Sequence, residues 1–213
     1  MKTRDFKPAP IDFLQHHEVL QNLIDTKPGD HICVLYDYSP LEQIGQVAAY
    51  LKEGIAAGEQ CIYVADDING EHLIAALRSA GIDVDSARDN NSMLIWTRER
   101  WREPGALDTV RKAAQVRQLV EAALNAGFAG VRFAVEMTWT LRPDLDPSEI
   151  EAWELHSNTL LQPGAPVRAL CLYGRQRLPS QTLVAGMRTH PSVLEKRAAH
   201  NADGQTAPRD SQR

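Results

Sequence analysis

The sequence lacks the features that define several large protein classes. It has only three cysteines in 213 residues, an odd number within apolar runs, so it offers no disulfide framework and we expect reduced thiols. No apolar run approaches the roughly 20 residues that span a bilayer. The amino-terminal segment MKTRDFKPAPIDF has no apolar core of the kind that a signal peptide needs. We therefore expect a cytoplasmic protein.

Excess positive charge is also missing, as are the motifs of common hydrolases. The formal net charge is −5 and the sequence pI is about 5.8, which argues against nucleic acid as the main partner. No serine–histidine–aspartate order, nucleophile elbow or metalloprotease helix is present. The sequence therefore does not predict any of these common hydrolase mechanisms.

What the sequence does contain is a repeated unit, an apolar segment followed by a helical one. Strand character is found at 31–36, 60–66, 93–97, 131–139 and 167–173. Helical periodicity is found at 11–25, 41–57, 70–79, 108–126, 147–161 and 180–188. This alternation predicts an α/β fold, with a mostly parallel sheet of about five or more strands and helices on both faces.

The same pattern predicts how the chain is divided. Residues 1–27 form a lead-in with one short amphipathic helix, and residues 28–194 form one domain without an internal linker. Residues 195–213 lack apolar periodicity and are expected to be a disordered tail.

The segment HICVLYDYSPLEQ (31–43) joins the first strand to a helix where many nucleotide-binding proteins carry a glycine-rich phosphate loop. It has no glycine to let backbone N–H groups wrap a phosphate and no lysine to balance its charge. Asp37 and Glu42 would repel phosphate instead. Ser39, Pro40 and Glu42 predict a capped helix start. We therefore do not expect ATP hydrolysis by the usual apparatus.

Ligands of open α/β sheets gather at the carboxyl ends of the strands. Glu136 interrupts an apolar strand there, and it either faces a ligand or forms a salt bridge with a neighbouring arginine such as Arg175. Tyr36, Trp139 and Tyr173 lie at or near strand ends. They either line a mostly apolar pocket or pack in the core.

Other polar residues also have two interpretations. His31 either contacts a ligand or forms a hydrogen bond at a strand start. With Cys33 and Cys171 it suggests soft metal ligation, but a paired CxxC motif is absent and no metal is expected. His190 is expected to end the last helix, favourably placed near its negative end. The charged run at 97–105 is a solvated loop or a clamp for an anion.

Several segments together resemble the MEDS domain, a sensory domain of methanogens and methylotrophs. They are GDHICVLYD, GEQCIYVADD, EMTW, LCLY followed by Arg175, and RTHP, and the resemblance covers residues 28–194. It implies a RecA-like three-layer fold, related to clock-protein ATPases, that has lost its phosphate loop. It also implies the sensing of small molecules, including simple hydrocarbon derivatives, in prokaryotic signal transduction and transcription control.

We therefore expect a non-enzymatic sensor that binds a small organic molecule in a degenerate nucleotide cleft, without cofactor or metal. The expected ligand-binding residues are His31, Tyr36, Asp37, Glu136, Trp139, Tyr173 and Arg175. The sequence carries no recognisable output domain, so we expect the signal to pass in trans to a histidine kinase or transcription regulator. A homodimer is a further expectation, and direct contact with nucleic acid or membrane is not expected. The alternatives are a protein–protein regulatory module without ligand and an atypical nucleotide-binding ATPase.

Overall fold

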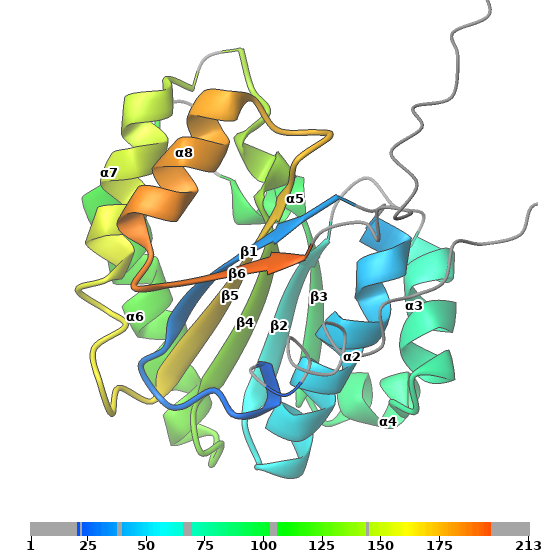
Figure 1. The fold of residues 1–213 in the computed structure, drawn as a ribbon. Helices are drawn as coiled ribbons and strands as arrows, with labels where there is room; N and C mark the ends of the chain where they lie inside the picture. Colours follow the sequence, from blue (N-terminus) through cyan, green and yellow to red (C-terminus); the bar gives the residue numbers. More distant parts are fainter. Residues whose placement is uncertain are drawn as a thin grey trace, which may run out of the picture.

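The structure is a computed structural model of the chain, and it describes residues 21, 23–37, 40–65, 70–102, 106–143 and 145–196. It has three layers, a parallel sheet between two layers of helices (Figure 1). The expected helix over 11–25 and the tail from 197 onward lie mainly or wholly outside the described residues.

The strands and helices alternate along the chain, as their hydrophobic patterns predict. The strands are β1 (His31–Tyr36), β2 (Gln60–Ala65), β3 (Met93–Thr97), β4 (Val131–Glu136), β5 (Val167–Gly174) and β6 (Ser192–Lys196). The helices are α2 (Pro40–Ala56), α3 (Gly70–Ser79), α4 (Val84–Asp89), α5 (Arg98–Trp101), α6 (Thr109–Asn125), α7 (Pro147–Ser157) and α8 (Ser180–Thr189), with a 3-10 turn η1 (Met137–Thr140).

The six strands form one sheet in the order β3-β2-β4-β5-β1-β6, and every pairing is parallel. This confirms the α/β class and the parallel sheet. The sixth strand was not among the predicted ones. β6 extends two residues past 194, the boundary that we predicted for the domain, and pairs with β1 from Ile32↔Ser192 to Tyr36↔Lys196.

The two faces of the sheet carry separate hydrophobic cores. Successive strand residues point to opposite faces, so Cys33 and Leu35 join one core while Val34 and Tyr36 join the other. Helices α6, α7 and α8 cover the first face, and α2, α3 and α4 cover the second (Figure 1). The nearly unbroken apolar strands follow from this burial on both sides.

Three local predictions differ from the structure. The strand expected over 131–139 ends at Glu136, where the chain tightens into η1. The short helix α4 was not predicted. Part of the charged run expected as a loop forms α5, because the Thr97 side chain accepts a hydrogen bond from the Arg100 backbone N–H and Trp101 is buried.

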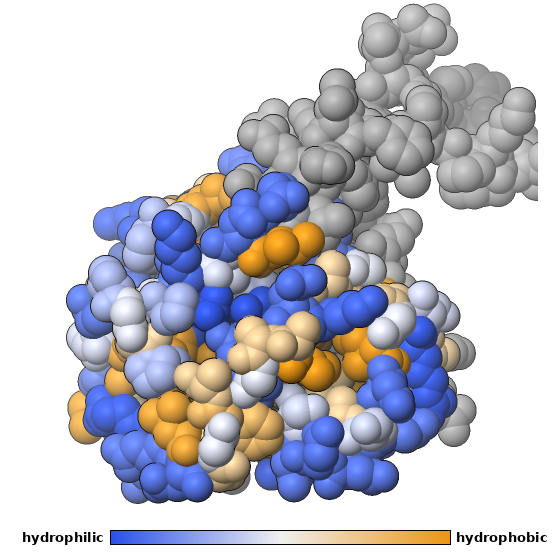
Figure 2. All heavy atoms as spheres, turned by 90° about the horizontal axis from the view of Figure 1, so that it is seen from below, coloured by the Kyte–Doolittle hydropathy of each residue, from blue (hydrophilic) through white to orange (hydrophobic). Residues whose placement is uncertain are grey.

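The surface mixes residue types. Seen from below, hydrophilic side chains alternate with small hydrophobic groups (Figure 2). Within the described part of the chain, no helix combines the length and the apolar character that crossing a membrane requires.

Candidate functional site

The sheet divides the seven residues expected to bind ligand among three places. They are Tyr36 and Glu136 on the α2 face, His31, Trp139 and Tyr173 on the α6–α8 face, and Asp37 and Arg175 just beyond or near the carboxyl ends of β1 and β5. In the described part of the structure, these seven residues therefore do not line one common cleft.

On the α2 face, the Glu136 carboxyl group lies between two tyrosines. The Tyr36 hydroxyl donates to its Oε2 at 2.7 Å, and the Tyr63 hydroxyl donates to its Oε1 at 3.1 Å. Burial raises the pKa of Glu136 to about 7, and the two hydrogen bonds oppose that rise. The two hydroxyls satisfy a carboxyl group that the sheet shields from water.

The alternative in which Glu136 pairs with Arg175 is wrong. The Arg175 guanidinium lies 3.8 Å from the Asp37 carboxylate and 3.2 Å from that of Glu195 on β6. These three side chains are partly exposed, and their ion pairs join the ends of β1, β5 and β6.

On the opposite face, four buried side chains from four elements converge. His31 begins β1 directly after a turn in which Gly29 adopts a φ of 94° and lies against the Gln162 backbone. Cys171 lies in the middle of β5. Glu154 projects from the buried side of α7, and His190 follows the last residue of α8.

Each donor atom in this cluster lies near others. His31 Nε2 is 3.5 Å from Glu154 Oε2 and 3.5 Å from Cys171 Sγ. His190 Nε2 is 3.5 Å from the same Glu154 Oε2. Tyr173, one of the predicted residues, donates its hydroxyl hydrogen to the other carboxyl oxygen, Glu154 Oε1, at 3.0 Å. These residue types are those that hold transition metals.

Burial disfavours the charged form of each of these groups. It lowers the pKa of His31 to about 4 and that of His190 to about 2, where the proximity of His31 adds to the effect. Burial raises the pKa of Glu154 to about 7 and that of the Cys171 thiol well above its usual value. His190 does end α8 as predicted, but a neutral imidazole gains little from the helix dipole, so the reason that we gave for its position does not apply.

A small cavity of about 40 Å³ adjoins this cluster, between the sheet and helices α6 and α7. Its polar lining consists of His31, Glu154, Ser157 and Cys171. The rest of the lining is apolar: Trp101, Val116, Phe133, Val135, Met137, Trp139, Trp153, Leu160, Leu161, Val167 and Ala169.

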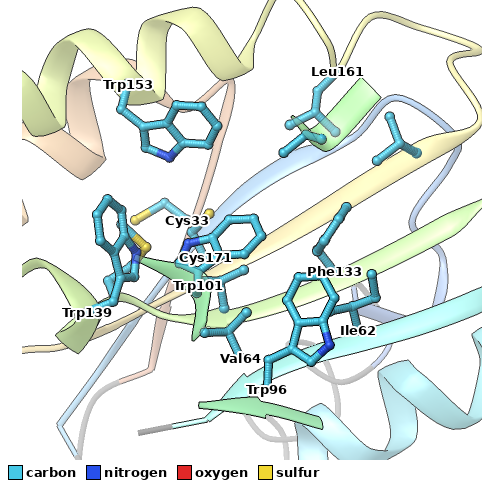
Figure 3. Packing of buried hydrophobic residues seen from close by; sticks show 14 of the residues in the cluster. Cys33, Ile62, Val64, Trp96, Trp101, Phe133, Trp139, Trp153, Leu161 and Cys171 are labelled. Carbon is cyan, nitrogen blue, oxygen red and sulfur yellow. The ribbon is translucent and has the colours of Figure 1, made fainter. Parts of the chain in front are cut away.

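Three tryptophans dominate the apolar wall. The rings of Trp101, Trp139 and Trp153 gather near Cys171, while Trp96 lies farther along the sheet (Figure 3). The Lys112 ammonium group lies 3.9 Å from the centre of the Trp101 ring and donates to the Trp101 carbonyl oxygen at 2.6 Å. The ammonium group of Lys112, which projects from α6, therefore stabilises the arrangement of the three tryptophan rings by cation–π contacts.

Sequence reasoning missed Glu154 as a site residue, although a signal was present. In the segment PSEIEAWELHS, Glu154 falls on the same helical face as Ile150 and Trp153, where an apolar residue would be expected. The helix is fixed in this position by Asp146, whose side chain accepts a hydrogen bond from the Ser148 N–H in a capping box with Glu149.

At the former phosphate-loop position, α2 begins at Pro40, as the sequence predicts. The predicted cap Ser39 lies outside the described residues, and so does Tyr38.

The sequence matches the MEDS family, described as the MEthanogen/methylotroph, DcmR Sensory domain, over residues 30–191. It is 27% identical over 175 residues to the transcriptional repressor DcmR of Methylorubrum extorquens. That alignment covers 81% of this chain and 62% of the relative, so the chain spans less than two thirds of the repressor's length.

The fold is also similar to a solved structure, that of the flagellar accessory protein FlaH from Methanocaldococcus jannaschii. The TM-score is 0.57 at 11% sequence identity, and the match covers 87% of this chain and 80% of that chain. At this identity the likeness establishes the fold alone, and it confirms the RecA-like α/β architecture that the resemblance implied.

Proposed function

The chain belongs to the MEDS family of sensory domains, and from that premise we propose that it is a non-enzymatic sensor for a small organic molecule. The family and the repressor relative support a sensory and regulatory role. The observation that carries the rest of the proposal is the buried cavity beneath α7, whose wall is mostly aromatic and aliphatic with a few polar groups at one side. Ligand sites for small molecules have this composition.

The size of the cavity limits the ligand. A cavity needs about 10–15 Å³ to hold one water molecule, and this cavity has a volume of about 40 Å³. The ligand class that fits is a molecule of a few heavy atoms, mostly apolar, with at most one or two polar groups directed at Glu154 or Ser157. A nucleotide is far too large for this space.

The cavity lies next to elements that reach the surface, so a bound ligand could change the arrangement of those elements. Trp153 and Glu154 are adjacent on α7, and Glu154 contacts His190 at the end of α8. Only Pro191 separates His190 from β6, which is an edge strand of the sheet. A ligand that prefers one arrangement of α7 and α8 would shift the population of both helices and of β6.

The receiver of the signal is then a separate protein that contacts this edge, a histidine kinase or a transcription regulator, or a second copy of the chain. The exposed backbone edge of β6 suits the addition of a strand from a partner. If the edge binds a partner with no ligand in the cavity, the chain is a protein–protein module instead. Partner binding that is unchanged by cavity-filling variants would favour this second function.

A melting-temperature screen tests ligand binding. We expect a panel of neutral molecules with one to four heavy atoms, including alcohols, haloalkanes and thiols, to contain at least one that stabilises the protein. At about ten times its dissociation constant, such a ligand stabilises the fold by about 1.4 kcal/mol, or about 3–6 °C for a domain of this size.

Two variants of helix α6 give the matched comparison. Val116 lines the cavity, and Val120 lies one turn further along the same helix without lining it. Val116→Phe should abolish the ligand-induced shift, whereas Val120→Phe should keep it, although each adds the same bulk to a buried position. Equal shifts in both variants would show that the molecules bind elsewhere and would contradict the proposed site.

A further inference from the structure

We propose that His31, Glu154, Cys171 and His190 bind a divalent transition-metal ion, with zinc as the best fit. The four donor atoms are all buried and lie within 4.8 Å of one another. This site goes beyond the proposed sensory function and does not depend on it, because it stands on the donor geometry alone.

The separations suit a tetrahedral ion. Zinc–nitrogen and zinc–oxygen bonds of about 2.0–2.2 Å and zinc–sulfur bonds of about 2.3 Å place neighbouring ligand atoms about 3.3–3.6 Å apart. Three of the contacts in the cluster measure 3.5 Å: Cys171 to His31, His31 to Glu154 and His190 to Glu154. The remaining pairs of donor atoms lie within 4.8 Å of one another.

The surrounding hydrogen bonds hold the hydrogen of both imidazoles on Nδ1, which leaves each Nε2 lone pair available to bind a metal ion. His190 Nδ1 lies 2.8 Å from the Gly186 carbonyl oxygen, so it carries the hydrogen and leaves a lone pair on Nε2. The Asn158 side chain donates to the Thr189 carbonyl oxygen at 2.7 Å, which turns its Oδ1 toward His31 Nδ1 at 2.8 Å. His31 Nδ1 must therefore donate, and its Nε2 also presents a lone pair. Metal-binding histidines typically donate the N–H of their other ring nitrogen to an oxygen acceptor in this way.

Without a cation, the polar atoms of the cluster are not all satisfied in the described structure. Both Nε2 lone pairs face the same carboxyl oxygen, Glu154 Oε2. Within the part of the chain that the structure describes, neither that oxygen nor His190 Nε2 has a hydrogen-bond partner. Leaving such buried groups unsatisfied destabilises the folded state. A proton on Glu154 Oε2 and the hydrogen of the Cys171 thiol, which lies 3.5 Å from His31 Nε2, could each serve one imidazole, whereas a metal ion binds all four donors together.

The donor set also selects the class of ion. Two imidazoles, one thiolate and one carboxylate favour zinc and similar ions over Mg²⁺ and Ca²⁺, which prefer oxygen ligands. On binding, the Cys171 thiol and the protonated Glu154 carboxyl group each give a proton to solvent, and they coordinate as thiolate and carboxylate. Four protein ligands close the coordination shell, as in a structural zinc site. The ion would tie α7 and the end of α8 to β1 and β5.

Metal content and cobalt spectroscopy test the site on the full chain. Protein loaded with Zn²⁺ and then dialysed should retain about one ion per chain by elemental mass spectrometry. Protein loaded with Co²⁺ should show thiolate-to-cobalt charge-transfer absorption in the near ultraviolet. Cys171→Ser should remove this absorption, and Glu154→Gln should lower the zinc content at least tenfold.

The matched control is Cys33, the residue that pairs with Cys171 across the β1–β5 ladder and is equally buried. Cys33→Ser should keep both the zinc and the cobalt absorption. A strong chelator should lower the melting temperature of the wild type and of Cys33→Ser, but not that of Cys171→Ser. Wild-type protein that keeps no zinc and melts at the same temperature with and without chelator would overturn the proposal and would leave a shared proton in the cluster. The ligand screen above can fail without affecting this result, and the reverse also holds.

Discussion

Glu136 is a fully buried carboxyl group whose described hydrogen bonds come from two tyrosine hydroxyls. Desolvation is the largest influence on it and raises its pKa from 4.5 to about 7. The titratable groups that face it are Tyr36 and Tyr63, which stay protonated because burial raises their own pKa values. Glu136 therefore favours the folded state in its protonated form.

This gives a pH dependence with a definite sign. The folded pKa lies above the unfolded one, so the contribution of the protonated group is complete below about pH 4.5 and is lost as the pH rises through about 7. Glu136→Gln mimics the protonated group. We expect this variant to match the wild type near pH 4.5 and to be more stable at pH 8, by up to about 3 kcal/mol.

Urea denaturation at both pH values measures the difference in unfolding free energy. Taking the difference between variant and wild type removes the contribution of other groups that titrate in the same range. A variant that is less stable than the wild type at pH 8 would show that the carboxylate is the favoured form of Glu136.

Individual residues of the site differ in how well they can be predicted from the sequence. Glu136 and Tyr36 stood out because they lie at a strand end, a place that can be assigned from local patterns. Glu154 and His190 acquire their meaning from contact with each other across α7 and α8. No local pattern encodes that contact, so the sequence predicts only a helix-ending role for His190 and no role for Glu154.

At the scale of elements, the amino-terminal ends of the strands are held by a buried ion cluster. Arg132 on β4 donates from Nε to Glu59 Oε2 at 2.6 Å, and Arg168 on β5 donates from Nη2 to Glu59 Oε1 at 2.6 Å. The Arg132 guanidinium also lies 4.7 Å from the centre of the Tyr50 ring on α2. One carboxylate thus connects two strands to the loop before β2.

Removing that carboxylate should destabilise the fold strongly. Glu59→Ala leaves two buried guanidinium groups without their anion, and breaking a buried pair in this way typically costs about 3–5 kcal/mol. Urea unfolding of Glu59→Ala should show a loss of this size. Glu53→Ala, which changes an exposed residue on α2, should change stability by less than about 0.5 kcal/mol. A similar small loss in both variants would contradict the role of the cluster.

The elements that sequence patterns predicted are those with strong periodicity. Five strands were visible as apolar runs; four of them are buried on both faces, whereas β3, at the edge of the sheet, is only partly buried. β6 was missed because its sequence, SVLEK, is short and mostly exposed at the edge of the sheet. The end of β4 was placed too late because Met137, Thr138 and Trp139 are as buried as the strand itself, although the chain there forms a 3-10 turn.

Close packing of α8 depends on a residue without a side chain. A Cβ atom on Gly186 would lie 2.6 Å from the Tyr173 ring, so the glycine lets α8 approach β5. The Gly186 carbonyl oxygen also orients His190. The helix, the tyrosine and the histidine are thereby fixed together beside Glu154.

At the scale of the whole molecule, the RecA-like sheet has a polar centre on each face. Glu136 and its tyrosines lie on the α2 face, and the His31–Glu154–Cys171–His190 cluster lies on the α6–α8 face with the tryptophan-lined cavity. The sequence predicted the parallel sheet and the missing phosphate loop, but it could not assign site residues to faces across strands that are not neighbours in the chain. In the tertiary structure, the cavity and the four-residue cluster lie beneath α7. The sequence had instead predicted a site near the turn between β1 and α2.

Tryptophan fluorescence tests the central claim, that this space binds a small molecule, most directly. Trp96→Phe removes the one tryptophan of the four that does not line the cavity, so the remaining emission comes from its wall. Titration of this variant with a small haloalkane should quench the emission along a saturable curve, and adding Val116→Phe should remove the saturation. Quenching that stays linear in concentration and is equal in both proteins would contradict the account.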